Sequence, residues 1–223
     1  MKKSLFLLLF LIVFTSINAQ INQFDANQKR HGIWKKYFKN GNIRYQGQFN
    51  HGKETGIFKY YSLASKKQPV MIKSFNNTDN IASVSFFTTT GKLISKGKMN
   101  GKKRVGKWVY YHNDGTTVMQ EENYLNGELN GKYTTYFSTK KPTIEANYLN
   151  GLLHGAYKRY SFKGHVYQEL HYKNGVLEGK AIYYNRLTGK LIKKGQYKND
   201  KKVGAWEFYM EGKLIETIEM KED

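Results

Sequence analysis

The sequence predicts an all-β protein, an elongated antiparallel array of β-hairpins with about eight units of 24–26 residues. Three observations favour this fold class. Short apolar runs alternate with turn residues along the chain, glycine is frequent (21 residues) while proline is rare (2 residues), and aromatic residues make up 15% of the chain. Such a composition favours short strands joined by tight turns over disorder. No segment shows a sustained apolar period of 3.6 residues, so we expect no stable helix.

A glycine that precedes each aromatic cluster sets the period of the array. With Ala82 in the corresponding place of one copy, the aligned positions are Gly32, Gly56, Gly106, Gly131, Gly155, Gly179 and Gly204. The steps between them are 24 to 26 residues, so eight phased units run from about His31 to the C-terminus. We expect stability to accumulate from contacts between neighbouring units rather than around one central core.

Each unit contains two strand-like runs. The second residue after the glycine is usually large and apolar, as at Trp108, and the fifth is always aromatic, as at Tyr111. A turn follows, and then a second apolar run that often ends at Asn-Gly. Two such runs bounded by turn residues predict one β-hairpin, so eight units predict sixteen strands. We attribute the recurring glycines to turns that need a positive φ, and we expect the aromatic columns to form ladders on one face.

Two parts of the array depart from the regular pattern. The second unit, around Ser62 to Asn80, is the least regular, and Pro69 predicts a loop or a sheet edge there. The last segment, residues 211–223, is acidic and is predicted to close the open end against edge-to-edge pairing.

The N-terminal residues 1–19 have the layout of a secretory signal peptide. Lys2 and Lys3 precede an apolar run from Leu5 to Phe14, and Ala19 marks the expected cleavage point. The run is shorter than the ~20 residues that a membrane-spanning helix needs. The chain has no cysteine, which excludes a lipid-modified N-terminus, disulfides and thiolate chemistry. We therefore expect a secreted or periplasmic protein.

The domain organisation follows from these observations. Residues 20–30 form an N-terminal lead-in, and residues 31–223 form the repeat domain. No segment after the signal peptide is apolar enough to suggest a membrane span.

The repeating unit, G-x-W-x-x-Y-Y-x-x-x-G-x-L followed by Y-x-N-G, resembles the bacterial variant of the MORN repeat. Residues 106–115 and 204–214 show the pattern best. The resemblance covers almost all of the repeat domain and implies a twisted antiparallel hairpin array. It also implies membrane attachment or protein scaffolding, as in eukaryotic MORN arrays, and some bacterial members are catalogued as YwqK-type antitoxins. This chain differs from a cytoplasmic antitoxin in carrying a predicted signal sequence.

The polar residues predict no catalytic, cofactor or metal site. The six histidines form neither an HxxxH nor an HExxH arrangement, and no nucleophile elbow or phosphate-binding loop is present. Glu121, Glu145 and Glu169 recur at steps of 24 residues, so we expect them in one column. A pair of them could perform acid–base catalysis. Because these glutamates recur with the repeat, the alternative interpretation is favoured, in which they are counter-charges for lysines. We therefore predict no enzyme activity.

The net charge of +20 makes the surface attractive to anions. The candidate binding surface consists of Lys102, Lys103, Arg104, Tyr157, Lys158, Arg159 and Tyr160. Lysines beside aromatic residues could track single-stranded nucleic acid, but the predicted export disfavours that partner and favours anionic lipid or acidic glycan. In the simplest alternative, the lysines only solubilise turns and protect sheet edges.

The leading functional hypothesis is a non-enzymatic secreted or periplasmic scaffold that binds a protein partner. A first alternative is an envelope module that binds anionic lipid or glycan through its basic face. A second is an antitoxin or immunity-type partner protein, although inhibition of a nuclease by nucleic-acid mimicry would need an acidic surface. These hypotheses leave the oligomeric state open.

Overall fold

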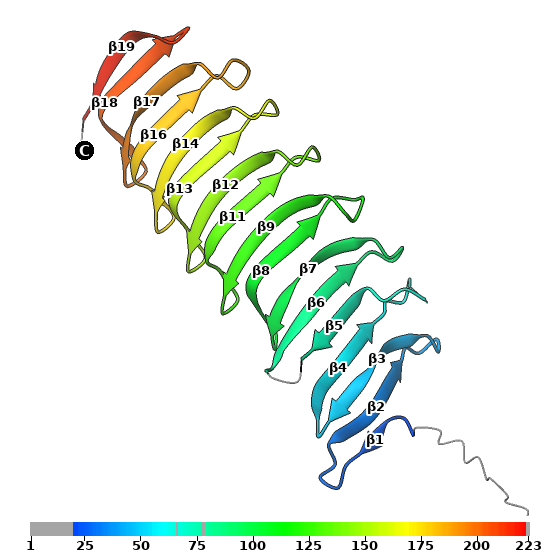
Figure 1. The fold of residues 1–223 in the computed structure, drawn as a ribbon. Coiled ribbons are helices and arrows are strands. Elements are labelled where there is room, and N and C mark those ends of the chain that lie inside the picture. Colours follow the sequence, from blue (N-terminus) through cyan, green and yellow to red (C-terminus); the bar gives the residue numbers. More distant parts are fainter. Residues whose placement is uncertain (1–19, 66, 77–78, 222–223) are drawn as a thin grey trace, which may run out of the picture.

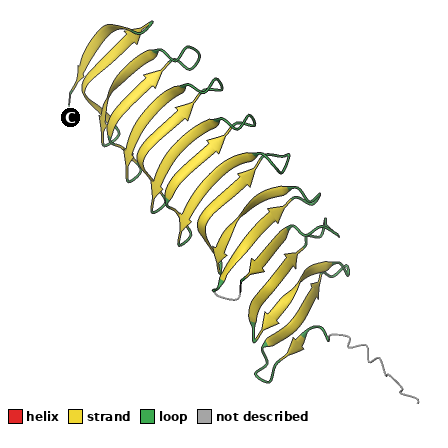
Figure 2. Ribbon diagram, viewed as in Figure 1, coloured by secondary structure: helices red, strands yellow, loops and turns green. Residues whose placement is uncertain are grey.

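The computed structural model describes residues 20–65, 67–76 and 79–221, and these form one elongated antiparallel sheet of 19 strands (Figure 1). Each strand pairs with the one before it, except that β10 and β11 both pair with β9, and β15 and β16 both pair with β14. The first and last strands lie at opposite ends of the ribbon (Figure 1). None of the described residues is helical (Figure 2). The predicted all-β hairpin array is thereby confirmed. The predicted signal peptide, residues 1–19, lies outside the described residues.

Sixteen strands of five to ten residues form eight hairpins, one for each unit of the sequence. They are β2 (Arg30–Tyr37) with β3 (Ile43–Asn50), β4 (Lys53–Tyr60) with β5 (Met71–Phe75), β6 (Ile81–Phe87) with β7 (Leu93–Asn100), β8 (Lys103–Tyr111) with β9 (Val118–Leu125), β11 (Gly131–Tyr136) with β12 (Pro142–Leu149), β13 (Leu152–Tyr160) with β14 (Val166–Lys173), β16 (Gly179–Tyr184) with β17 (Leu191–Lys198), and β18 (Lys201–Met210) with β19 (Lys213–Met220). Three further strands have two residues each: β1 (Gln23–Phe24), β10 (Glu128–Leu129) and β15 (Val176–Leu177).

The turns between units follow the Asn-Gly signal. Leu149 pairs with Leu152, so Asn150 and Gly151 form a two-residue loop in which both φ angles are positive, 49° and 80°. This is the pattern of a type I′ turn, whose twist matches that of the flanking strands. At Asn100-Gly101 only the glycine has a positive φ.

The glycine that sets the repeat period belongs to the first strand of its hairpin and not, as predicted, to a turn: Gly106 lies at a β-bulge inside β8, while Gly131 and Gly179 begin β11 and β16. Gly106 has a φ of 62°, and the β7–β8 register shifts between Lys96 and Lys98. A Cβ on Gly106 would meet no atom within 4 Å, so the backbone conformation, not space, favours glycine. Ala82 replaces glycine in the unit where β5 and β6 pair without a shift.

The two faces of the sheet carry different residues, because successive residues of a strand point to opposite sides. We call one side the aromatic face; it carries the second residue after each bulge position, namely Trp34, Phe58, Val84, Trp108, Tyr133, Tyr157, Ala181 and Trp206. The other side, the charged face, carries the fifth-position aromatic residues and Glu121, Glu145 and Glu169. The expected single-face ladder is therefore wrong for the fifth position: Tyr136 donates a hydrogen bond to Glu121 (3.2 Å), while Tyr133 packs against Tyr148.

The core lies on the aromatic face, where side chains cover one another along the sheet. Trp108, Trp206, Phe58 and Val84 are fully buried. The indole of Trp108 lies directly over Gly97 of the preceding strand, where an added Cβ would stand 2.4 Å from the ring. Gly47 with Phe58, and Gly195 with Trp206, repeat this arrangement. The ring contacts are mostly edge-to-face, as for Phe49 and Phe58 at 88°, which is a favoured aromatic geometry.

The two irregular parts of the sequence are visible in the fold. Pro69 lies in the long loop between β4 and β5, and β5, with five residues, is the shortest of the hairpin strands. The acidic C-terminal segment forms β19, which pairs with β18 and exposes Leu214 and Ile215.

Candidate functional site

Cations stacked on tryptophan rings are the most distinctive feature of the aromatic face. Three units place a cation four residues before the tryptophan, and therefore on the same face of the strand. The pairs are Arg30–Trp34, Arg104–Trp108 and Lys202–Trp206, with cation-to-centroid distances of 5.1, 4.5 and 4.5 Å. Units with a tyrosine or alanine at the tryptophan position carry a leucine instead, at Leu129, Leu153 and Leu177. The cation and the indole thus occur together, as expected for cation–π pairs.

A buried carboxylate, that of Glu122, lies beside the Arg104–Trp108 pair. Glu122 is only 7% exposed, and its two oxygens accept hydrogen bonds from the Gln120 amide (2.6 Å) and the Tyr124 hydroxyl (2.7 Å). Arg104 Nη1 donates to the hydroxyls of Tyr110 (2.5 Å) and Tyr124 (2.9 Å) and lies 3.8 Å from Glu122 Oε2. The network gives the buried carboxylate the partners that its burial requires.

This network breaks the repeat. Glu122 lies opposite Trp108 in the β8–β9 pair. Small or apolar residues fill the corresponding position in six other units, at Gly47, Gly97, Ala146, Leu170, Gly195 and Ile218, and Lys73, which pairs with Glu54, fills it in the second unit. The repeat period points to the neighbouring Glu121, which recurs at steps of 24 residues, and gives no indication of Glu122. The sequence signal for Glu122 is its departure from the small or apolar residues that most other units carry at this position. Burial raises the pKa of Tyr110, and the nearby charge of Glu122 raises it further.

The predicted binding residues are distributed over both faces and do not meet. Lys102 is exposed in the β7–β8 turn and Lys103 is exposed at the start of β8, while Arg104 belongs to the network above. Arg104 and Arg159 lie four strand spacings apart, roughly 19 Å. The candidate residues therefore do not form one continuous surface.

The stretch Tyr157 to Tyr160 alternates between the faces. Tyr157 packs against Tyr172 on the aromatic face (5.7 Å between centroids), and Arg159 lies over Tyr167 (5.3 Å). On the charged face, Lys158 pairs with Glu169, and Tyr160 donates a hydrogen bond to Glu145 (2.6 Å). Residues that are adjacent in this strand thus take part in different surfaces.

The glutamate column of the charged face is paired with lysines. Lys107, Lys132 and Lys158 lie 2.7, 3.3 and 3.7 Å from Glu121, Glu145 and Glu169. The hydrogen bond from Tyr160 and then that from Lys132 lower the pKa of Glu145. A carboxylate held ionised in this way serves as a counter-charge, not as a general acid.

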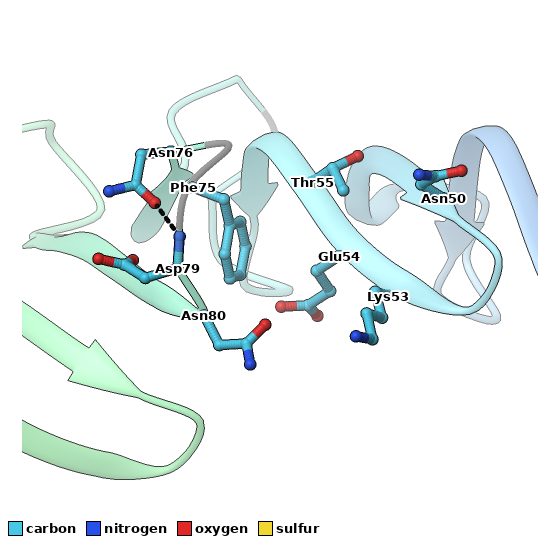
Figure 3. Close-up of a pocket in the computed structure, with 8 residues that line it drawn as sticks. All are labelled: Asn50, Lys53, Glu54, Thr55, Phe75, Asn76, Asp79 and Asn80. Atoms are coloured by element: carbon cyan, nitrogen blue, oxygen red, sulfur yellow. Dashed lines mark hydrogen bonds between the residues drawn. The ribbon is translucent and has the colours of Figure 1, made fainter.

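A hollow of about 740 Å³ lies beside the irregular second unit (Figure 3). It is lined by Asn50, Lys53, Glu54, Thr55, Phe75, Asn76, Asp79 and Asn80. Its carboxylates are already engaged: Glu54 accepts a hydrogen bond from the Tyr60 hydroxyl (2.8 Å), and Asp79 accepts one from the Ile81 amide (2.9 Å). The described lining residues include no nucleophile paired with a base.

In the part of the chain that the structure describes, no three His, Cys, Asp or Glu residues gather as metal ligands. The same residues include no helix of the length and apolarity needed to cross a membrane.

Comparison with known protein families finds a family model that matches parts of the chain. The family model of the MORN repeat variant matches residues 30–51, 129–150 and 153–174, while no curated protein matches the chain. The matches coincide with the β2–β3, β11–β12 and β13–β14 hairpins. The resemblance to the MORN repeat variant is therefore confirmed at three segments, each of which is one hairpin of the array.

Proposed function

We propose that the protein is a non-enzymatic, exported repeat scaffold that binds a protein partner through its aromatic face. MORN repeats suggest a scaffold for protein or membrane interaction, and the sheet offers an elongated surface roughly 75 Å long. The choice of face rests on a single observation: among the described residues, three cations lie over aromatic rings of this face without a carboxylate partner.

On the charged face, carboxylates neutralise lysines at regular intervals. The pairs are Lys107–Glu121, Lys132–Glu145, Lys158–Glu169 and Lys194–Glu207. On the aromatic face, Lys73 and Arg104 pair with Glu54 and Glu122. Arg30, Lys193 and Lys202 lie over aromatic rings of the same face. Among the described residues, these three cations have no carboxylate within ion-pair distance. The aromatic face therefore keeps free positive charge beside aromatic rings, of which Trp34 and Tyr183 are partly exposed.

This combination favours a protein partner. Tyrosine, tryptophan and arginine are the residues most enriched where protein interfaces gain their binding free energy. Rings already held by neighbouring rings lose little side-chain entropy on binding. A partner that lies along the ribbon would contact several units at once, so its affinity would be distributed along the array.

The test is capture of a partner from envelope extract with two matched variants. Tyr148→Ser/Tyr172→Ser removes two rings of the aromatic face, and Tyr111→Ser/Tyr184→Ser removes two rings of the charged face. We expect the first variant to lose the captured protein and the second to retain it, with circular dichroism verifying that both fold. Loss with the charged-face variant alone would overturn the choice of face.

Anionic lipid or glycan is the second candidate, favoured by the net charge of +20. Each lysine or arginine near an anionic membrane contributes ~1 kcal/mol of binding free energy. Sedimentation with phosphatidylserine vesicles should then show binding at low salt that weakens as salt rises, and none with phosphatidylcholine alone. Absence of binding to the anionic vesicles at low salt would remove this candidate.

Export is tested separately from binding. If residues 1–19 are a signal peptide, the protein recovered from the producing cell should begin at Gln20. Recovery of a chain that retains Met1 would contradict export by this route.

A further inference from the structure

Two lysines lie over neighbouring rings of the aromatic face, near the C-terminal end of the array. Lys193 Nζ is 4.6 Å from the ring centroid of Tyr183, and Lys202 Nζ is 4.5 Å from that of Trp206. The two rings are neighbours, with centroids 6.4 Å apart. The hydroxyls of Tyr183 and Tyr197 are 3.3 Å apart, so one donates to the other and the second O–H remains available.

Neither ammonium group has an ion-pair partner among the described residues, although Glu216 of β19 lies on the same face, two strands from Lys193. No carboxylate of the described chain lies within 4.0 Å of either. The acidic residues of the adjacent turns are engaged elsewhere: Glu178 accepts a hydrogen bond from the Asn199 amide, and Asp200 accepts one from the Leu177 amide. Burial and then the nearby charge of Lys202 lower the pKa of Lys193, as expected for two like charges that are partly removed from water.

The Arg104 network shows which group complements such a cation. There, a carboxylate of the same chain, Glu122, stands opposite the tryptophan, 3.8 Å from Arg104. The residue that stands opposite Trp206 is Ile218. Lys202 therefore occupies the place of Arg104 in an arrangement whose carboxylate is missing.

We propose that Lys193 and Lys202, with the hydroxyls of Tyr183 and Tyr197, form a site for a carboxylate side chain in an acidic segment of the partner protein. This inference rests on the proposed scaffold function and names the chemistry of the partner. Both ammonium groups and the available O–H donate to the incoming oxygens. The aromatic rings beneath limit access of water, which strengthens charge-assisted hydrogen bonds.

The first test titrates fluorescein-labelled hexaglutamate into the protein. Lys193→Gln/Lys202→Gln removes the two site charges, and Lys180→Gln/Lys213→Gln removes two exposed lysines of the same hairpins as a matched control. We expect the site variant to bind about tenfold more weakly, the effect of losing at least one charge-assisted hydrogen bond. The control should stay within about twofold of the parent, because distant surface charges are screened. Equal weakening by both variants would overturn the site.

The second test supplies the missing carboxylate. Ile218→Glu places an acidic side chain opposite Trp206, as Glu122 stands opposite Trp108. We expect this variant to lose hexaglutamate binding about as fully as the double lysine variant, whereas Ile218→Gln should retain it. Unchanged binding by Ile218→Glu would contradict the proposal, since the added carboxylate would then not reach the cations.

Further arms separate the proposed ligand from other anions. The choice of a protein carboxylate would be overturned if inorganic phosphate displaced hexaglutamate at equal concentration. It would also be overturned if phosphatidylserine vesicles bound more tightly than the peptide through the same two lysines. A captured partner that still binds Lys193→Gln/Lys202→Gln would remove this site and leave the scaffold function standing. Site-dependent hexaglutamate binding without any captured protein would support the site and count against the scaffold.

Discussion

At the scale of single residues, the sizes of side chains are matched across the boundary between units. Gly97 lies beneath Trp108, and Gly195 beneath Trp206. Where the following unit carries the small Ala181, the preceding strand carries the large Leu170, and both belong to one buried cluster. In a sheet with no second layer, this matching is what covers the largest rings.

Gly97→Ala should therefore destabilise the protein. Its Cβ would stand 2.4 Å from the indole of Trp108, and overpacking of this kind costs about 1–3 kcal/mol in the free energy of unfolding. Urea denaturation measures the loss. In a Trp108→Val background the same substitution should cost much less, and Lys96→Ala, on the opposite face, should have little effect. An equal loss with and without Trp108 would contradict the steric explanation.

Glu122→Ala should also destabilise the protein, because it leaves Arg104 without its carboxylate and the Tyr124 hydroxyl without its acceptor. We expect a loss of about 1–3 kcal/mol in the free energy of unfolding. Glu121→Ala is the matched control: its ion pair with Lys107 lies at the surface, where such a pair contributes about 1 kcal/mol or less. A double-mutant cycle with Arg104→Leu checks the coupling, and strictly additive losses would contradict the network.

The sequence predicted the residues of the site only in part. Arg104 was selected as a member of a basic cluster, whereas in the fold it lies over Trp108 beside a buried carboxylate. Tyr157 and Lys158 were grouped because they are adjacent, but adjacent strand residues point to opposite faces. The like-charged pair Lys193 and Lys202 is formed by two strands, so no local pattern of residues indicates it.

At the scale of the element, the eight hairpins could be predicted, but the role of the recurring glycine could not. A positive φ is typical of both tight turns and bulges, so composition alone does not separate the two. The register does: β8 continues through Gly106 with a shift against β7, while β6 continues through Ala82 without one. The three two-residue strands were likewise not predicted, since β10 and β15 arise where the strand is interrupted for one residue.

Gly106→Ala should destabilise the β7–β8 pair through the backbone alone. The φ of Gly106 is 62°, and the space around it is open, so the cost is that of a left-handed conformation, about 1–2 kcal/mol. Gly106→Asn should cost less, because asparagine tolerates this region better than alanine. Urea denaturation of the two variants measures the difference. Equal losses for alanine and asparagine would show that the conformation is not the cause.

At the scale of the whole molecule, the two ends of the ribbon differ in how far other residues cover their last strands. Residues 20–30, predicted as a lead-in, contribute β1 and the first residue of β2. Phe24 packs edge-to-face on Trp34 (5.0 Å), and Asp25 lies 2.6 Å from His51. This segment therefore covers the first ring of the aromatic face. At the other end, β19 is exposed over almost its whole length and carries Glu216 and Glu219; that their charge protects this edge from pairing stays a prediction.

The charge balance of the whole molecule predicts its response to acid. With a net charge of +20, the protein relies on a small number of carboxylates as counter-charges. The hydrogen bonds from Tyr160 and Tyr209 are the largest contributions that lower the pKa of Glu145 and Glu207 in the fold. A carboxyl with a lowered folded-state pKa stabilises the fold above its unfolded pKa, and this contribution is lost as pH falls through the folded value.

The thermal midpoint should therefore fall as pH is lowered from 6 to 3, and the loss should begin near the ordinary glutamate pKa of 4.5. Glu145→Gln lacks one of these contributions, so we expect it to be less stable than the parent at pH 6 and to approach the parent's midpoint as pH falls. Lys180→Gln changes the net charge without removing a carboxyl and should keep a constant difference from the parent. Circular dichroism melts at several pH values measure both series. A gap between Glu145→Gln and the parent that persists unchanged at pH 3 would show that the stabilisation does not depend on ionisation of this carboxyl.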